Sequence, residues 1–181
     1  MNNALPILGF CAASSGMGKT TLLTKLIPEL AKLGIRTSII KHAHHNFDID
    51  KPGKDSYRLR EAGAVQTLVA SSQRWALMTE LSRTEKYAAH EPDLPELIAN
   101  IDMSLVDLIL VEGFKYAHIA KIEIHRPSLN MPLLANTDQD IIAIACDDAI
   151  HTPLPILDLN DPPIVADFIQ HWLKDTSNAE N

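Results

Sequence analysis

The sequence predicts an α/β fold in which helices flank a mostly parallel, twisted β-sheet. Short apolar runs alternate with amphipathic segments, which is the pattern of repeated β-α-β units. Two of the runs, Leu5 to Ala12 and Val106 to Val111, are almost continuously apolar, as expected of strands covered on both faces. With 181 residues the chain is near the usual size of one domain, so we expect a single domain over residues 1–175.

The first part of the chain predicts one β-α-β unit. Residues 5–12 form its first strand, and leucine and isoleucine at helical spacing predict a helix over residues 19–33. Pro28 should kink this helix without ending it, because the apolar spacing continues beyond the proline. Residues 37–41 form the second strand, and the polar segment 42–53 that follows is expected to be a loop.

The rest of the chain continues the alternation. Helices are predicted over residues 55–62, 95–101 and 164–173, and strands over residues 64–70, 74–78, 106–111, 121–125 and 140–146. The predicted fold leaves room for a small β extension beside the main sheet. Residues 80–93 are charged and irregular, and the small polar residues 176–181 predict a disordered C-terminal tail.

Composition and charge restrict the function classes. The formal net charge of −7 argues against a large basic surface for nucleic acid, so no nucleic-acid partner is expected. Cys11 and Cys146 both fall in predicted strands and are expected to be reduced core residues. No signal peptide and no membrane segment are predicted, which together with the free thiols indicates a cytoplasmic protein.

The strongest motif is Ala13-Ser-Ser-Gly-Met-Gly-Lys-Thr20, which matches the phosphate-binding P-loop except that alanine replaces the first glycine. A buried strand precedes it and an amphipathic helix follows, so backbone N–H groups can converge on phosphates. This context makes the predicted fold P-loop NTPase-like. The residues expected to bind the nucleotide are Ser15, Gly16, Met17, Gly18, Lys19, Thr20 and Thr21. Lys19 would contact the β- and γ-phosphates, and the Thr20 hydroxyl would ligate Mg²⁺.

A second acidic position has the form of a Walker B strand. Glu112 follows an aliphatic run, at the end of a strand where α/β sheets bind ligands. Glu112 is therefore predicted to hold Mg²⁺ or to orient an attacking water, and with Lys19 it is a candidate catalytic residue. The alternative is a structural carboxylate after a core strand. Asp107 is a weaker candidate because it lies at the other end of the same strand.

The segment after the second strand is rich in histidine and aspartate. Its place suits a switch-like loop, from which Asp48 is predicted to contact Mg²⁺ and Asp50 is an alternative. His42, His44 and His45 could instead form a zinc site with these carboxylates, but the spacing lacks helical i, i+4 geometry and a cysteine pair. The basic residues that follow could meet a second anionic ligand or form a solvated face; they are Lys51, Lys54 and Arg58.

The sequence gives weaker signals for residues that recognise the nucleotide base. No Asn-Lys-x-Asp segment is present, and the nearest carboxylates that could accept from a guanine edge lie in Asn136–Asp138 and Asp147–Asp148, where turns are an equal alternative. Arg74 could reach an anionic ligand, and the neighbouring Trp75 is interpreted as a core residue.

Several segments in order resemble the MobB family of molybdopterin-guanine dinucleotide biosynthesis adapter proteins. They are Ala13–Thr21, Ile40–His45, Asp50–Tyr57, Gln73–Thr79 and Asp107–Lys115. The resemblance extends over almost the whole chain. It implies a homodimer that binds GTP with Mg²⁺, hydrolyses it feebly, and assists the guanylyltransferase that attaches GMP to molybdopterin. Molybdopterin itself or a molybdoenzyme acceptor is a further implied partner, and no membrane partner is implied.

The resemblance also assigns positions. It implies GTP at Ser15 to Thr21, with Mg²⁺ at Thr20 and Glu112 nearby. Ser14 stands where some P-loop proteins carry a second lysine, so a lysine donated across a dimer from this position is absent. We therefore expect slow hydrolysis. A small-molecule kinase or ligase that transfers a phosphoryl group from ATP is the alternative function, because the loop 42–55 could supply a base.

Overall fold

The chain folds into two compact units. The computed structural model describes residues 5–43, 47–87 and 92–179. We call Met1–His42 together with Leu97–Asn181 the main unit, and Ala43–Glu96 the small unit. The sequence predicted one domain over residues 1–175, and the division falls inside that range. Both connections between the units lie in or beside the polar segments, 42–53 and 80–93, that were predicted to be irregular.

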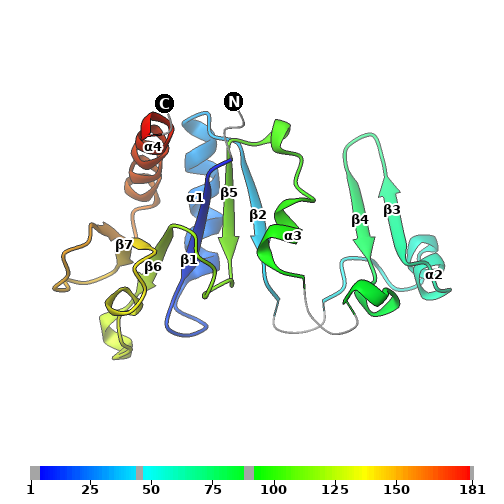
Figure 1. Ribbon diagram of the computed structural model, residues 1–181, viewed down its shortest axis with the longest axis horizontal. Coiled ribbons are helices and arrows are strands. Elements are labelled where there is room, and N and C mark those ends of the chain that lie inside the picture. The colour runs from blue at the N-terminus through cyan, green and yellow to red at the C-terminus, as the bar shows by residue number, and fades with distance from the viewer. Residues whose placement is uncertain (1–4, 44–46, 88–91, 180–181) are drawn as a thin grey trace. The chain divides into compact units, whose positions relative to one another are not determined.

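The main unit contains a six-stranded sheet in which every neighbouring pair is parallel (Figure 1). The strand order is β2-β5-β1-β6-β7-β8, so β1 lies between β5 and β6 at the centre. Parallel strands end at the same edge, so the loops after β1, β5 and β6 are neighbours there. The strands are β1 (Ile7–Cys11), β2 (Thr37–Lys41), β5 (Leu108–Glu112), β6 (Lys121–His125), β7 (Ile141–Cys146) and β8 (Ile156–Asp158).

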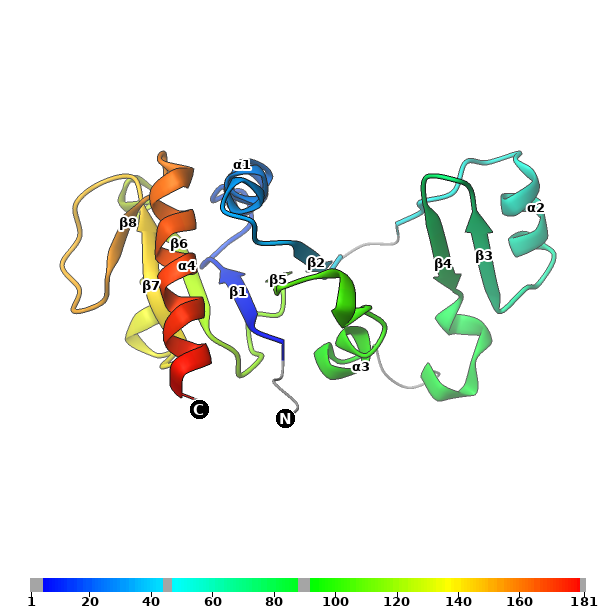
Figure 2. The ribbon, with the colours of Figure 1, turned by 90° about the horizontal axis from the view of Figure 1, so that it is seen from above.

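Two helices cover one face of this sheet. They are α1 (Lys19–Lys32) and α4 (Pro162–Ala179), which contact each other (Figure 2). Their apolar sides meet alternate residues of the strands in one continuous core, which includes Leu26 of α1, Ile169 of α4 and Ile124 of β6. The helix α1 continues through Pro28, as its apolar spacing predicted. This packing fixes the start of α1 at the end of the loop that follows β1.

The opposite face of β6 carries polar side chains that are nevertheless buried. Glu123 is fully buried, and its carboxylate accepts hydrogen bonds from the backbone N–H groups of Leu134 and Ala135, both at 2.9 Å. Lys121 is 2% exposed, and its Nζ lies 2.8 Å from Asp138 Oδ2. These bonds satisfy the buried charges and hold the segment before β7 against the sheet.

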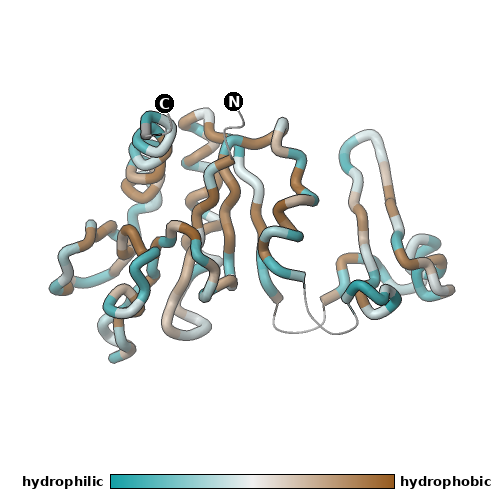
Figure 3. Tube along the Cα trace, viewed as in Figure 1, coloured by the Kyte–Doolittle hydropathy of each residue, from teal (hydrophilic) through white to brown (hydrophobic). Residues whose placement is uncertain are grey.

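The small unit is a β-hairpin with one helix. Strands β3 (Gln66–Ala70) and β4 (Trp75–Thr79) pair antiparallel, and α2 (Asp55–Glu61) precedes them. This hairpin confirms the predicted small β extension. No residue of these three elements is buried, and Figure 3 shows broken, mixed hydropathy along both strands of the hairpin. Trp75, predicted to be a core residue, is 63% exposed.

Several boundaries differ from the prediction. The strand β8 was not predicted, because three residues are too short to show an alternating pattern. The helix α4 extends to Ala179, so residues 176–179 are helical and the predicted disordered tail is wrong there; residues 180–181 lie outside the described residues. The helix continues through these polar residues because positions that face solvent need no apolar side chain.

One short helix and several 3₁₀ turns complete the structure. The helix is α3 (Leu94–Ile98), and the turns are Leu81–Arg83, Glu85–Tyr87, Met103–Leu105, Pro127–Leu129 and Leu134–Asn136.

Both cysteines are buried and free, as predicted, and burial followed by the nearby Glu123 carboxylate raises the pKa of Cys11 to about 12. Within the described ranges, no helix combines the length and the apolar character that a membrane span requires.

Candidate nucleotide-binding site

The loop after β1 has the backbone geometry of a phosphate-binding turn. Gly16 has φ 78° and Gly18 has φ 104°, a left-handed region that favours glycine. A Cβ atom at Gly18 would also lie only 3.3 Å from Nη2 of Arg126. The helix α1 begins at the next residue, Lys19, so its first N–H groups face the turn. The sequence positions of the glycines therefore follow from the shape of the loop.

The side chains of this loop divide into two groups. Met17 is fully buried in the core, so it can offer a ligand only its backbone. Ser15, Thr20 and Thr21 are exposed. Lys19 is half-buried, and its Nζ donates a 3.4 Å hydrogen bond to the backbone oxygen of Ser14. The lysine is thus folded along the loop, where an ammonium group can meet phosphate oxygens.

Glu112 lies against the start of α1. The Thr20 hydroxyl donates to Oε1 of Glu112 at 3.0 Å, although the two residues are far apart in sequence. Lys41 completes the cluster, with its Nζ 3.1 Å from Oε2 of Glu112 and 3.2 Å from Oγ1 of Thr20. Glu112 is 8% exposed, so its charge is largely removed from water. A buried carboxylate of this kind requires a cation or donors beside it, and Lys41 and Thr20 supply them.

The Thr20 and Glu112 oxygens fit a magnesium ion. Mg²⁺ prefers hard oxygen ligands at 2.0–2.1 Å in an octahedron, which places adjacent ligands about 2.9 Å apart. The 3.0 Å between Thr20 Oγ1 and Glu112 Oε1 matches that separation. Among the described residues no group of three or more histidine, cysteine or acidic side chains could hold a metal alone. Mg²⁺ takes few protein ligands and completes its shell with water and phosphate, so two protein oxygens are enough to hold it.

The turn after Glu112 is held tightly by His42. The backbone N–H of His42 donates to the backbone oxygen of Glu112 at 2.8 Å, and its ring lies 5.2 Å from that of Phe114. Gly113 has φ 103°, and a Cβ there would lie 2.8 Å from Cβ of His42. Only glycine fits at this position. His42 therefore packs against the turn that presents Glu112.

The roles of Lys41 and Arg126 were not predicted from the sequence. Lys41 is the register partner of Glu112 between β2 and β5, a relation that the shared edge of two parallel strands could have indicated. Arg126 follows β6, donates from Nε to the backbone oxygen of Met17 at 3.0 Å, and pairs with Asp147. A single arginine after a strand carries no motif, so no sequence signal could identify this contact.

Asp48, the other predicted magnesium ligand, belongs to the small unit. Its Oδ2 accepts from Nη2 of Arg60 at 2.6 Å, and its Oδ1 accepts from the N–H of Asp50 at 2.9 Å. The backbone hydrogen bond and then the Arg60 guanidinium lower the pKa of the Asp48 carboxyl. Its contact with Mg²⁺ stays a prediction. His44 and His45 lie outside the described residues, and Lys51, Lys54 and Arg58 are exposed.

The carboxylates considered for base recognition have structural partners. Asp138 pairs with the buried Lys121, and Asp147 pairs with Arg126. Oδ1 of Asp148 accepts from the N–H of the next residue, Ala149, at 2.7 Å, while the residue is exposed. Asp148 is thus the carboxylate of this group that keeps most capacity to accept from a ligand.

The geometry agrees with comparisons to known sequences. The family model MobB, described as molybdopterin guanine dinucleotide synthesis protein B, matches residues 7–147. A molybdopterin-guanine dinucleotide biosynthesis adapter protein of Escherichia coli (strain K12) is 52% identical over 94% of both chains. One from Haemophilus influenzae is 46% identical, covering 96% of this chain and 92% of its own. These matches include the loop after β1 and the strand that ends at Glu112.

Solved structures agree with the same family. A crystal structure of molybdopterin-guanine biosynthesis protein B is similar with a TM-score of 0.70 and 25% identity, covering 93% of this chain and 99% of that one. The crystal structure of Bacillus subtilis MobB is similar with a TM-score of 0.68 and 25% identity, over 92% and 96% of the two chains. The P-loop NTPase-like fold is thereby confirmed. On its sequence, its fold and the geometry of the loop after β1, the chain belongs to the MobB family.

Proposed function

We propose that the chain is a GTP-binding adapter that assists the synthesis of molybdopterin guanine dinucleotide in the cytoplasm. The observation that carries the proposal is the cluster of Thr20, Glu112 and Lys41 beside the loop 13–21. Hydroxyl, carboxylate and ammonium groups at the start of a helix are the set that binds a triphosphate with Mg²⁺. The biosynthetic pathway in this proposal is taken from the names of the relatives in Escherichia coli and Haemophilus influenzae.

In this proposal the residues from Ser15 to Thr21 bind the phosphates. Their backbone N–H groups and the Lys19 ammonium neutralise the charge, while Thr20 and Glu112 hold Mg²⁺. The metal supplies charge stabilisation at the phosphates. Lys41 balances Glu112 when the carboxylate holds no metal, because its Nζ lies 3.1 Å from Oε2. A lysine at position 14 is absent, which supports slow GTP hydrolysis over rapid turnover.

The adapter role requires partners. The chain would act as a homodimer on the guanylyltransferase that joins GMP to molybdopterin, with molybdopterin or a molybdoenzyme as further partners. Bound GTP would then shift the population of loop conformations that the partner binds. The names of the relatives favour this role over a kinase or ligase that transfers phosphoryl from ATP.

Glu112→Gln tests the metal site. The amide keeps the shape of the side chain but loses the charge, so GTP affinity should become nearly independent of Mg²⁺ while the nucleotide still binds. The measurement is calorimetric titration with GTP, with Mg²⁺ and with a chelator. We expect the enhancement by Mg²⁺ to fall by roughly tenfold or more, since a direct ionic ligand is lost.

A matched control for this change is Glu29→Gln in α1, where the carboxylate pairs with Lys32 and lies away from the loop 13–21 in sequence. This control should keep the full dependence on Mg²⁺. An unchanged dependence in Glu112→Gln would contradict the proposed metal role. Loss of folding in that variant, seen by circular dichroism, would make Glu112 a structural carboxylate and also count against the proposal.

A further inference from the structure

Two ion pairs flank the loop 13–21 at the edge of the main sheet. The strand β1 lies between β5 and β6, so the loop that follows β1 has a strand pair on each side (Figure 1). On the side of β5, Lys41 pairs with Glu112. On the side of β6, Arg126 pairs with Asp147. The proposed metal site uses the first pair, and the second pair takes no part in it.

The strand register brings Arg126 and Asp147 together. His125 of β6 is the register partner of Cys146 of β7, and the two charged residues are the next ones along their chains. In the 3₁₀ turn that follows β6, the N–H of Leu129 donates to the backbone oxygen of Arg126 at 3.0 Å. The backbone that carries the arginine is therefore held at the edge where the loop after β1 also lies.

The guanidinium of Arg126 makes two directed contacts. Its Nε donates to the backbone oxygen of Met17 at 3.0 Å, and its Nη1 donates to Oδ2 of Asp147. Its Nη2 lies against Gly18, where a Cβ atom would be 3.3 Å away. Both charged side chains are mostly shielded from water, so solvent competes less for these bonds than at an exposed ion pair. One arginine thus ties the end of β7 to the middle of the loop that follows β1.

The oxygen that Arg126 holds belongs to a peptide group of the phosphate-binding turn. The side chain of Met17 is fully buried, so this residue is fixed by the core through its side chain and by the arginine through its carbonyl. The Met17–Gly18 peptide bond is trans, and the C=O and N–H of such a planar unit point in opposite directions. A donor bound to the Met17 oxygen therefore directs the N–H of Gly18 to the side away from Arg126.

This direction matters for an anion on the loop. Gly18 is the N-cap of α1, and the first N–H groups of a helix have no partner within the helix. In the proposed site these groups and the N–H of Gly18 converge on the phosphates. A cation at a carbonyl also polarises the peptide group, which makes its N–H a stronger donor. Arg126 thereby favours phosphate binding without touching the nucleotide.

We propose that Arg126 is a positioning residue that orients the Met17–Gly18 peptide group for phosphate binding, and that Asp147 in turn holds Arg126. This inference rests on the proposed function, since it takes the phosphates of the nucleotide to lie on the loop 13–21. It gives the end of β7 a part in forming the phosphate site.

Direct contact of Arg126 with a phosphate is the competing role, and the two roles predict opposite effects at Asp147. Phosphates are anionic, so removal of a nearby carboxylate should raise the GTP affinity if only charge matters. If Asp147 holds Arg126 against the loop, its loss should lower the affinity although the site becomes more positive. The contacts favour the holding role, because Nε and Nη1 are already directed to Met17 and Asp147.

The test is calorimetric titration of GTP with Mg²⁺ into the full-length protein and its Asp147→Asn variant. We expect the GTP affinity to fall by roughly fivefold or more, because a neutral hydrogen bond replaces a charge-assisted one on the guanidinium. Asp158→Asn is the matched control, since it removes the same charge from an exposed position at the end of β8, on the same edge of the sheet. Unchanged or increased affinity in Asp147→Asn would overturn the proposal.

A double-mutant cycle tests whether Asp147 acts through Arg126. Arg126→Met removes both contacts of the guanidinium and should lower the GTP affinity at least as much as Asp147→Asn. In the Arg126→Met background, Asp147→Asn should cause no further loss, because the carboxylate then has no guanidinium to hold. Additive losses in the double variant would contradict the proposed dependence. Circular dichroism checks the fold of each variant, and Asp147→Asn keeps the proposal testable if Arg126→Met does not fold.

An NMR measurement reports on the peptide group itself. The amide nitrogen of Gly18 belongs to the same peptide group as the Met17 oxygen, so its chemical shift in the nucleotide-free protein should change when the hydrogen bond from Arg126 is lost. We expect this change in Arg126→Met and Asp147→Asn but not in Asp158→Asn, and an unchanged Gly18 resonance in the first two would overturn the proposal. Failure of GTP to bind the wild type would refute the proposed function, whereas equal GTP affinity in the wild type and both variants would refute only this inference.

Discussion

The main unit and the small unit stabilise their strands in different ways. Every residue of β5 and β6 in the main unit is buried, whereas no residue of β3 or β4 in the small unit is. The first sheet is covered by α1 and α4, so apolar burial dominates its stability. A two-stranded hairpin is marginal alone, and here side-chain hydrogen bonds fasten it. One unit is therefore a rigid scaffold, and the other depends on a few polar contacts.

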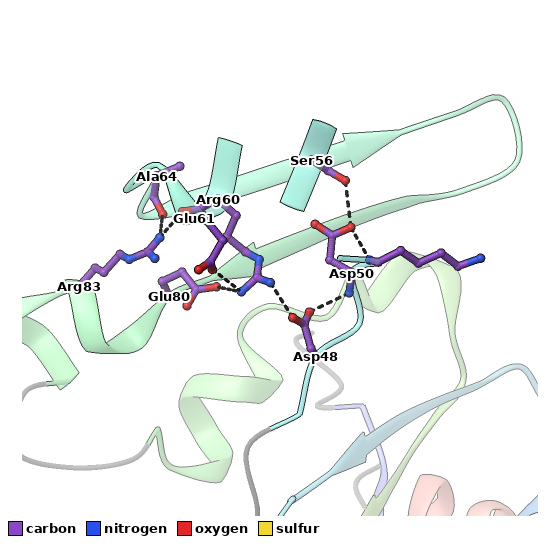
Figure 4. Close-up of polar contacts among 9 residues, drawn as sticks. Asp48, Asp50, Ser56, Arg60, Glu61, Ala64, Glu80 and Arg83 are labelled. Carbon is purple, nitrogen blue, oxygen red and sulfur yellow. Dashed lines mark hydrogen bonds and ion pairs between the residues drawn. The ribbon is translucent and has the colours of Figure 1, made fainter. Parts of the chain in front are cut away.

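The polar contacts of the small unit centre on two arginines. Arg60 pairs with Asp48 and Glu80, and its side chain is only 11% exposed. Arg83 donates to the backbone oxygens of Arg60 and Ala64 (Figure 4). These bonds join α2 to both ends of the hairpin. A unit stabilised by apolar burial and a unit held by side-chain hydrogen bonds should therefore respond differently to mutation.

The largest expected effect is on the core of the main unit. Ile124→Ala removes a fully buried side chain from β6 and should lower the free energy of unfolding by about 2–5 kcal/mol. Leu68→Ala removes a hairpin side chain that is 61% exposed and should change it by about 0.5 kcal/mol or less. Urea unfolding followed by circular dichroism measures both. If the two variants lowered the free energy of unfolding by similar amounts, the main unit and the small unit would not differ in how burial stabilises their strands.

A smaller and more local effect is expected from Arg60→Ala. It removes the ion pairs of Arg60 with Asp48, Glu61 and Glu80, so local opening of the hairpin becomes easier. Backbone amides of residues 66–79 should then exchange with solvent roughly tenfold faster or more. Amides of β5 in the main unit should keep their protection. Hydrogen exchange measured by NMR tests this, with Arg58→Ala on the exposed side of α2 as the control. Equal protection in both variants would show that the network does not fasten the hairpin.

The smallest effect is expected at an exposed ion pair of the main unit. Arg36 and Asp107 are 2.7 Å apart, and the Arg36 hydrogen bond holds the pKa of Asp107 at about 2. A lowered folded-state pKa contributes stability above the unfolded value near 4, and this contribution is lost as the pH falls from there towards 2. An NMR titration of the Asp107 carboxyl should show this midpoint, and Arg36→Gln should raise it. A midpoint near 4 in the wild type would refute the assignment.

Much of the fold could be predicted because its strands are buried on both faces. Continuous apolar runs identify β1 and β5, and glycines at required left-handed positions identify the loop 13–21. The division into two units could not be predicted, because the hairpin shows the same alternation whether it joins a sheet or stands apart. The length of α4 was missed because its last turns carry only polar residues.

The site was predictable where a motif determines a single geometry. The sequence indicated that Thr20 and Glu112 lie close, and the structure brings them within 3.0 Å. Lys41 ends a strand at the same edge as Glu112, but it was missed because the order of the strands was not predicted. No local pattern marks the contact of Arg126. Asp50 was considered only as a metal ligand. In the structure one of its carboxylate oxygens accepts from the N–H of Lys51 and from the hydroxyl of Ser56.

The proposed function depends most directly on GTP binding at the loop 13–21. The most direct measurement is calorimetric titration of the protein with GTP and with ATP, each with Mg²⁺, beside Lys19→Ala and the control Lys32→Ala at the exposed end of α1. We predict a clear preference for GTP with negligible turnover. The affinity for GTP should fall by roughly 100-fold or more in Lys19→Ala and stay unchanged in Lys32→Ala, since only the first variant removes charge-assisted phosphate contacts. Preference for ATP with turnover, or full affinity in Lys19→Ala, would contradict it.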